Sequence, residues 1–205
     1  MKKFSLSTIF VLSLIFSNIS FAKTFNIDAA HSSIEFSIKH LGIVPVKGSF
    51  KKFSGSFEID EKTGKAKNLS VKIDVDSIYT NQDDRDAHLK SKDFFNVRND
   101  VYDIVEKNRY ITFKAAKFST GDRKISGKLK ILKTTKKIKL KSKIKPLKVE
   151  GKIMRVGFEA TGEIDRQDFG LSWQKPATGL LAKAAGKFVG DDVELIINVS
   201  AEAKK

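Results

Sequence analysis

The sequence contains no cysteine in its 205 residues. The chain can therefore form no disulfide, no lipid anchor on an N-terminal cysteine and no zinc site built from thiolates. Its stability has to come from a hydrophobic core, and the length is sufficient to build one. Proline is scarce as well, with three copies, and no Pro/Ser-rich linker divides the chain. These absences predict one domain with a substantial core.

A long apolar run is also missing. The longest apolar stretch, Ile9 to Phe16, is well short of the roughly 20 residues that cross a bilayer. Two lysines precede it, and Ser20 and Ala22 supply the small side chains that a signal peptidase requires. We therefore expect residues 1–22 to be a signal peptide, cleaved after Ala22. The exported domain would then span residues 23–205.

Acidic residues are outnumbered by basic ones, which gives a formal net charge of +15. Loss of the two lysines of the leader would lower this charge by two. A positive charge of this size favours anionic partners but says nothing about the fold. Since export argues against nucleic acid, the anionic partners that remain are lipid head groups, diphosphates and acidic proteins.

Apolar and polar residues alternate along most of the chain. In "SIEFSIKH" three apolar side chains, Ile34, Phe36 and Ile38, fall on one face of an extended strand. The same period recurs in "FSGSFEID", "LSVKIDVD", "RYITFKAAKF", "KISGKLKIL", "KIMRVGFEATGEID" and "DVELIINVSAE". About eight such segments, separated by turns such as "EKTGKAKN", predict an all-β fold, either a closed antiparallel barrel or a sandwich. The inward side chains of such a barrel form either a solid core or the wall of an apolar cavity.

Two segments interrupt the alternation. Residues 81–95, "NQDDRDAHLKSKDFF", predict a short helix that starts near Asn81, with acidic residues in its first turn. The second segment runs from Arg166 to Asp192 and has a glycine-rich middle, which indicates a connection between strands.

Four ordered blocks of the sequence resemble the signature blocks of the YceI-like family of bacterial periplasmic proteins. They are "DAAHSSIEFSIKHLGIVPVKGSFKKFSGSFEID", "DSIYTNQDDRDAHLKSKDFF", "GFEATGEIDRQDFGLSW" and "VGDDVELIINVSAEA". The resemblance implies a lipocalin-like extended antiparallel barrel around a long apolar pocket. It also implies a periplasmic protein that binds a polyisoprenoid or similar amphiphilic lipid, with no catalytic residues and no cofactor other than a bound isoprenoid lipid or quinone.

The chain departs from the family pattern after the second block. The family often continues there with a proline-containing segment, whereas this chain has an apparent insertion without proline between Asn96 and Asn108. No contact of the family is carried over to this segment.

The resemblance makes the barrel interior the expected ligand site. A polyisoprenoid tail gains about 0.8 kcal/mol for each methylene-sized group that leaves water, so an apolar tunnel can bind it with few polar contacts. The same inward side chains would pack against one another in a solid core. The candidate lining residues are Ile34, Phe36, Ile38, Phe53, Phe57, Val71, Ile73, Phe113, Phe158 and Trp173.

The polar residues Arg85, Asp86 and His88 have more than one interpretation. Catalysis would need a nucleophile or a paired acid and base, and no nucleophile-elbow pattern is present. A metal site would need more ligands, and the sequence has three histidines and no HExxH pattern. The two interpretations that remain are contact with the lipid head group at the pocket mouth and a structural tie to the barrel. His31 and Arg166 lie within the family blocks and have the same two interpretations.

The segment "KTTKKIKLKSKIKPLK" carries a lysine at every second position from Lys137 to Lys145. These lysines form a solvated strand face or a protected sheet edge, or they dock the protein onto an anionic membrane leaflet.

The sequence therefore predicts a periplasmic carrier of a polyisoprenoid lipid or isoprenoid quinone. One alternative is an isomerase or hydrolase that acts on the same lipid through His88 and Asp86. Another is a solid-cored adaptor that works with a membrane cytochrome. Each of these interpretations is also compatible with a homodimer.

Overall fold

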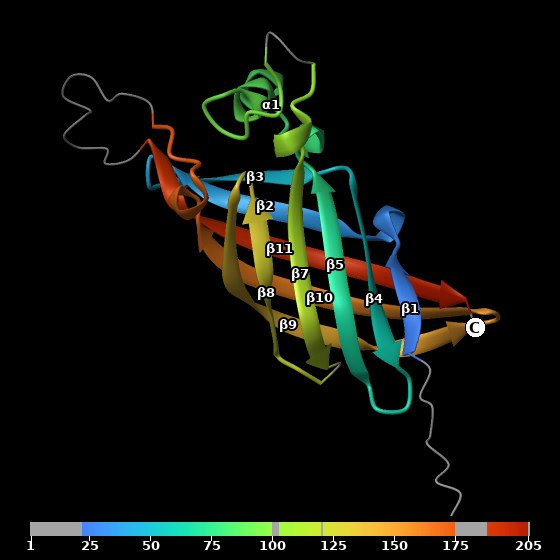
Figure 1. Cartoon of the computed structure of the whole chain (residues 1–205). Coiled ribbons are helices and arrows are strands. Elements are labelled where there is room, and N and C mark those ends of the chain that lie inside the picture. Colours follow the sequence, from blue (N-terminus) through green and yellow to red (C-terminus); the bar gives the residue numbers. More distant parts are fainter. Residues whose placement is uncertain (1–21, 100–102, 120, 175–187, 205) are drawn as a thin grey trace, which may run out of the picture.

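The computed structural model describes residues 22–99, 103–119, 121–174 and 188–204, and shows one large antiparallel sheet (Figure 1). Of the expected signal peptide, residues 1–21 lie outside the described residues. The strands are β1 (Ala22–Ile27), β2 (Ser33–His40), β3 (Val44–Phe50), β4 (Phe53–Asp60), β5 (Lys65–Asp74), β6 (Ile78–Tyr79), β7 (Tyr110–Ser119), β8 (Lys124–Ile131), β9 (Thr134–Glu150), β10 (Ile153–Asp165) and β11 (Val189–Lys204).

Helical structure within the described ranges is confined to short segments. The described residues contain one α-helix, α1 (Asp83–Lys90), and no helix among them is long and apolar enough to span a membrane. The 3-10 turns are η1 (Ala29–His31), η2 (Val75–Ser77), η3 (Glu106–Asn108) and η4 (Gln167–Phe169).

The sheet closes on itself through β11. Neighbouring strands follow the order β1-β4-β5-β7-β8-β9-β10-β11, and β1 then pairs with β11 through Asn26–Glu202 and Ile27–Ala201. These eight strands form a closed barrel. The first half of β11 pairs instead with β2, and β3 and β6 extend the sheet beyond β2. The expectation of an all-β antiparallel barrel of about eight strands is confirmed.

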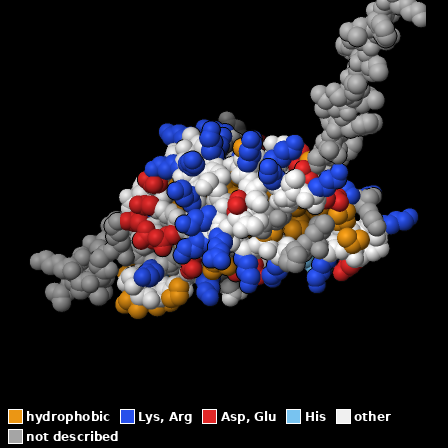
Figure 2. Space-filling model, turned by 90° about the horizontal axis from the view of Figure 1, so that it is seen from below, with side chains coloured by type: hydrophobic (Ala, Val, Ile, Leu, Met, Phe, Trp, Pro, Cys, Tyr) orange, Lys and Arg blue, Asp and Glu red, His pale blue; other side chains and the backbone are white. Residues whose placement is uncertain are grey.

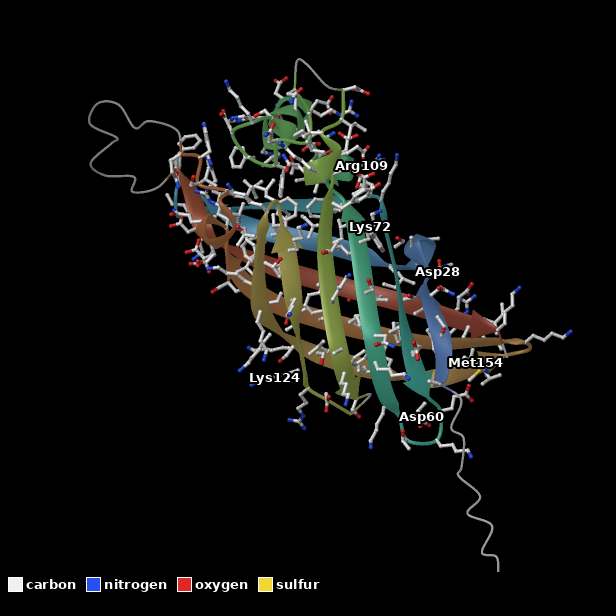
Figure 3. All side chains as sticks on the ribbon, in the orientation of Figure 1. Asp28, Asp60, Lys72, Arg109, Lys124 and Met154 are labelled. Atoms are coloured by element: carbon white, nitrogen blue, oxygen red, sulfur yellow. The ribbon has the colours of Figure 1, made fainter. Side chains whose placement is uncertain are left out.

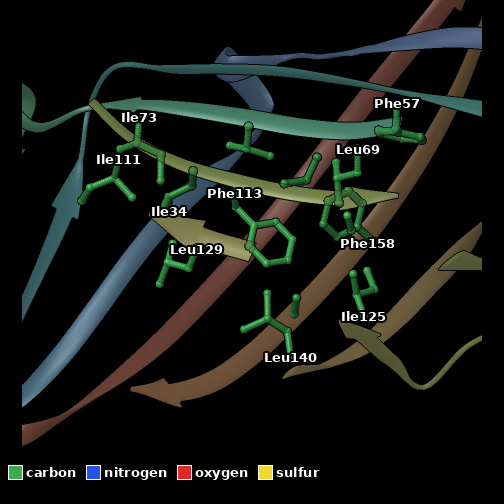
Figure 4. Packing of buried hydrophobic residues seen from close by; sticks show 14 of the residues in the cluster. Ile34, Phe57, Leu69, Ile73, Ile111, Phe113, Ile125, Leu129, Leu140 and Phe158 are labelled. Atoms are coloured by element: carbon green, nitrogen blue, oxygen red, sulfur yellow. The ribbon is translucent and has the colours of Figure 1, made fainter. Parts of the chain in front are cut away.

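The alternation in the sequence explains which side chains enter the barrel. In β8 the side chains of Ile125, Leu129 and Ile131 are buried, whereas the intervening lysines are exposed. Since successive residues of a strand point to opposite faces, the apolar residues of every barrel strand meet in the interior. Figure 4 shows this packing from close by, with side chains from β2, β4, β5, β7, β8, β9 and β10.

Aromatic side chains fill one part of the interior. The rings of Phe25 and Phe57 stack with their centroids 5.8 Å apart, and Phe57 also contacts Phe118 and Phe158 edge to face. Phe25 and Phe57 are almost completely buried. This aromatic cluster leaves no room for a ligand at the position of Phe57.

The helix α1 forms close to the place that the sequence predicts. Asn81 has a positive φ of 62°, so the chain turns there, and Gln82 takes the N-cap position and accepts from the backbone N–H of Arg85. Asp83 and Asp84 follow in the first turn, where the helix dipole favours negative charge. In Figure 1 α1 and the residues around it lie above one end of the barrel. We call residues 80–99 the α1 segment.

One close approach between neighbouring strands depends on a glycine. A Cβ atom at Gly127 would lie 2.3 Å from Cζ of Phe113 and 2.7 Å from the carbonyl oxygen of Lys114. We expect Gly127→Ala to lower the free energy of unfolding by about 1–3 kcal/mol, because β7 and β8 must shift to accept the methyl group. Thermal denaturation measures the effect. The matched control is Gly121→Ala, since nothing lies within 4 Å of a Cβ atom at Gly121. Equal melting temperatures for the two variants would contradict the prediction.

Candidate functional site

The barrel encloses a cavity of about 770 Å³, which is within the usual range of small-molecule sites. Its wall comes from every described strand except β4, and α1 covers part of it. Most of the lining side chains are apolar. The interior is thus not the solid core of the alternative prediction.

Most of the predicted apolar lining residues face this cavity. The residues in its wall are Ile34, Phe36, Ile38, Val71, Ile73, Phe113, Phe158 and Trp173. Two predicted residues, Phe53 and Phe57, are not part of the wall. Phe57 is 2% exposed because it packs into the aromatic cluster, and Phe53 packs against the buried core from the start of β4. Both assignments are corrected on this geometry.

Other parts of the wall were not among the candidate lining residues. The additional residues from the strands continue the same alternation, and those from the α1 segment have no such period. They include Leu69, Ile111, Ile125, Leu129, Ile131, Ile138, Leu140, Ala160, Ile164, Leu195, Ile197 and Val199 from the strands and Leu89, Phe94 and Phe95 from the α1 segment.

Polar groups of the α1 segment border the cavity. Arg85 lies in the wall, where its Nε donates to Oγ1 of Thr80 (2.7 Å) and its Nη2 donates to the carbonyl oxygen of the same residue (2.6 Å). Among the described residues Nη1 of Arg85 has no recorded hydrogen-bond partner, so this end of the guanidinium can still donate. The geometry is consistent with head-group contact by Arg85 as well as with a structural tie.

Asp86 has the structural role. Its side chain is buried, and Oδ1 accepts from the backbone N–H of Thr80 (2.9 Å) and from the hydroxyl of Thr80 (2.5 Å). The cavity wall does not include Asp86. The carboxylate thus ties α1 to the end of β6 and does not approach the ligand space.

His88 lies in an aromatic group at the same border. Its ring is perpendicular to that of Trp173, with centroids 4.7 Å apart, and it contacts Phe94 edge to face at 5.2 Å. Nε2 of His88 lies 3.0 Å from Oδ2 of Asp93. His88 therefore pairs with Asp93 and not with Asp86, so the acid–base pair of the enzyme alternative is not assembled.

The guanidinium of Arg166 forms its hydrogen bonds within the protein. Its side chain is 3% exposed, and every N–H of its guanidinium has a protein acceptor. The acceptors are the carbonyl oxygens of Gly190, Leu171, Trp173 and Val189 and the carboxylate of Asp191. Burial lowers the pKa of this guanidinium from its ordinary value, although arginine stays charged in proteins. Arg166 borders the cavity but positions Trp173 instead of offering a donor to a ligand.

His31 lies outside the site. It belongs to η1, between β1 and β2, where its side chain is exposed and its Nδ1 is 2.7 Å from Oδ2 of Asp28. The hydrogen bond from His31 lowers the pKa of Asp28. The same carboxylate accepts from Arg155, 3.3 Å away. Figure 3 shows Asp28 far from the α1 segment, so the proposed head-group role of His31 is corrected. No cluster of three metal-ligating side chains occurs in the described part of the chain.

Ion pairs fix the α1 segment and the residues after it to the barrel. The guanidinium of Arg98 binds both carboxylate oxygens of Asp76, at 2.7 and 2.6 Å. Arg109 reaches Asp74 at 3.2 Å, and Figure 3 shows Arg109 at the base of the α1 segment. Arg98 lies in the insertion to which no family contact was carried over, so this anchor was not predicted.

The lysines of β9 face solvent. All five from Lys137 to Lys145 are exposed, and Figure 2 shows basic side chains spread over this underside of the barrel. β9 pairs with both β8 and β10, so it is not a sheet edge. Its register with β8 places Lys137 opposite Lys128 and Lys141 opposite Lys124. Like charges directly opposite each other destabilise the pairing of the two strands that carry them. Docking of this face onto an anionic membrane stays a prediction.

Comparison with known proteins agrees with this geometry. A family model described as the YceI-like domain matches residues 25–201. The chain belongs to the YceI-like family. It is 33% identical to the protein YceI of Salmonella agona over the full length of both, and 35% identical to a UPF0312 protein of Pectobacterium atrosepticum, covering 88% of this chain and 86% of that protein.

Solved structures of the YceI type share the fold. A crystal structure of the Campylobacter jejuni YceI protein matches with a TM-score of 0.60 and 28% identity, and covers 100% of this chain and 99% of that one. A polyisoprenoid-binding domain from Saccharophagus degradans matches with a TM-score of 0.58 and 16% identity, over 87% and 98% of the two chains. At that identity the second likeness concerns the fold alone.

The anchor at Asp76 predicts an acid-dependent loss of stability. The hydrogen bonds from Arg98 hold the pKa of Asp76 below its ordinary value of 3.8. The ionised carboxylate of Asp76 therefore stabilises the fold fully above its ordinary pKa. This stabilisation is lost as the pH falls through the lower pKa of the folded state. We expect Asp76→Asn to lower the free energy of unfolding by about 1 kcal/mol at neutral pH, and the difference from the unchanged protein to vanish in acid.

Urea denaturation at several pH values measures this difference. The matched control is Asp192→Asn, which removes an exposed carboxylate with no recorded ion pair in the described structure. A difference for Asp76→Asn that does not depend on pH would contradict the prediction.

Proposed function

We propose that this protein is a periplasmic carrier that holds an isoprenoid lipid, either a polyprenyl chain or an isoprenoid quinone, inside the barrel. The observation that carries the proposal is the cavity of about 770 Å³ inside the barrel, with an apolar wall along the strands and polar groups where α1 covers it. Membership of the YceI-like family and the fold shared with a polyisoprenoid-binding domain support this choice.

An apolar cavity of this kind can hold a tail without specific polar contacts. Ten methylene-sized groups moved out of water gain about 8 kcal/mol, and this corresponds to a dissociation constant on the order of micromolar. The wall is formed by side chains from ten strands, so it is fixed before the ligand binds. A carrier needs binding of this strength, because it must also release its cargo.

The polar end of the ligand belongs beside Arg85 and His88. Arg85 has an unpartnered Nη1 among the described residues, and a guanidinium can bind a phosphate or a carbonyl oxygen. Trp173 and Phe94 form the apolar surroundings of His88, suitable for a flat quinone ring. Asp86, Arg166 and His31 have no part in this contact.

The first experiment is native mass spectrometry of the protein purified gently from the periplasm, followed by extraction of any bound molecule. We expect a stoichiometric adduct with an isoprenoid chain. An apo mass, followed by failure to take up added polyprenyl lipids or quinones, would refute the carrier function.

A bulky residue in the cavity should block uptake. Ala160 is 2% exposed and lies in the wall, so Ala160→Phe places a ring where the tail would lie. Displacement of two methylene-sized groups of the tail from the cavity alone costs about 1.6 kcal/mol. We therefore expect an isoprenoid quinone to bind about tenfold more weakly, or weaker still. Quenching of the fluorescence of Trp173, the single tryptophan of the chain, measures the binding.

The matched control is Thr161→Phe, because Thr161 is the next residue of β10 and its side chain is exposed. Ile38→Trp provides a second blocking variant in a different strand of the wall, and its quinone binding is measured by isothermal titration calorimetry because it adds a second tryptophan. Unchanged quinone binding in both blocking variants, with the melting temperature retained, would show that the ligand lies elsewhere.

The role of Arg85 can be separated from that of the tail. We expect Arg85→Met to weaken the binding of a polyprenyl phosphate by about tenfold, since a hydrogen bond to a charged group contributes about 1.5–3 kcal/mol. Binding of a neutral isoprenoid quinone should change less. Isothermal titration calorimetry measures both ligands, and Arg123→Met, at an exposed site outside the wall, is the control. An equal loss for the two ligands would leave Arg85 with only its structural tie to Thr80.

A further inference from the structure

The hairpin between β2 and β3 ends in exposed apolar side chains. Ile43 is 80% exposed and Val44 is 58% exposed, which are the highest values among the large exposed hydrophobic residues of the described chain. Pro45 is exposed beside them. We call residues 41–45 the hairpin tip. Single exposed apolar residues are ordinary on protein surfaces, but two large ones next to each other at the end of a hairpin are a small apolar patch.

The hairpin tip lies at the border of the cavity. The residues on either side of it, His40 and Val46, are both part of the cavity wall. The ring of His40 contacts Phe188, which also lines the cavity, with centroids 4.6 Å apart. The backbone N–H of Leu41 donates to the carbonyl oxygen of Phe188. The apolar surface inside the barrel therefore continues towards the hairpin tip.

The turn itself has an unusual residue. Leu41 has a positive φ of 52°, and Gly42 follows with 70°. Glycine, asparagine and aspartate adopt this conformation more readily than leucine, and they are the usual residues of such hairpin turns. The turn thus carries an apolar side chain where the backbone favours a small or polar one. This observation does not depend on the cavity.

We propose that the hairpin tip inserts into the lipid surface from which the cavity is loaded and to which it delivers its cargo. The proposal rests on the proposed function, since it requires a cargo that resides in a membrane. Ile43 and Val44 enter the boundary between head groups and acyl chains, as apolar residues of membrane-associated elements do. Lys39 and Lys47 flank the hairpin tip and are exposed, so they meet anionic head groups at the same depth.

The size of the hairpin tip favours a membrane over a protein partner. A stable protein interface takes roughly 20–30 residues from each side, whereas the hairpin tip has five. A lipid surface needs no matching shape, and insertion of two side chains gives the weak, reversible attachment that a carrier requires.

The experiment measures the partition of the exported protein onto vesicles of phosphatidylethanolamine and phosphatidylglycerol by flotation. We expect the double variant Ile43→Ser, Val44→Ser to bind these vesicles about tenfold or more weakly, because two apolar side chains are removed from the contact. The rate of quinone transfer from the vesicles, followed by Trp173 quenching, should fall by a similar factor. Quinone affinity measured in detergent should not change, since neither residue belongs to the cavity wall.

The matched control is the double variant Val149→Ser, Ile153→Ser. These residues have the same side chains, are 52% and 37% exposed, and lie on the β9–β10 hairpin at the opposite end of the molecule in Figure 1. We expect this variant to retain vesicle binding and transfer. Equal loss in the two double variants, or no loss in either, would overturn the proposal.

Two further outcomes separate the proposal from its alternatives. A dimer in gel filtration that the hairpin-tip variant loses, with vesicle binding unchanged, would show that the hairpin tip joins two copies and would overturn membrane insertion. Failure of the unchanged protein to bind quinone in detergent would refute the carrier function separately, because that measurement involves no membrane.

Discussion

The pairing of β11 with three different strands is the constraint on which the rest of the structure depends. β11 runs beside β10 over most of its length, beside β2 in its first half and beside β1 at Ala201 and Glu202. The strand that pairs with β11 changes from β2 to β1 at η1, where the Ser32 hydroxyl and the backbone of Ser200 hydrogen-bond to each other. The barrel is closed on the β1 side of this point, and on the β2 side the sheet continues outward through β3 and β6.

This arrangement gives the two regions of the interior different contents. The aromatic cluster around Phe57 occupies the space near β1 and β4, and the cavity extends between β2, β11 and the strands across from them. Chemically similar apolar side chains therefore serve as packed core in one place and as cavity wall in the other. Polar side chains of the wall come from the α1 segment, which the ion pair of Arg98 with Asp76 anchors near the end of β5, and also from β2 and Arg166. The barrel thus combines an apolar wall with a separately anchored cover.

Alternation in the sequence was enough to predict which face of each strand turns inward, as Ile34, Val71 and Phe113 show. It could not predict depth along the barrel, because a period of two residues is the same everywhere on a strand, and for this reason Phe57 was assigned to the cavity. The polar residues were harder, since their roles depend on acceptors distant in the chain. The carbonyl oxygens that hold Arg166 lie up to 24 residues away, and the η1 turn places His31 far from α1.

The closing strand is also the last of the described strands in chain order. The pairings of β11 with β1 and with β2 both join the last described strand to the first two, so neither can form until β11 is available. Chains with such long-range pairing fold slowly. During synthesis the barrel would accordingly remain open until β11 has been made. Such a delay suits the export that we propose, in which the chain crosses a membrane in an extended form before it folds.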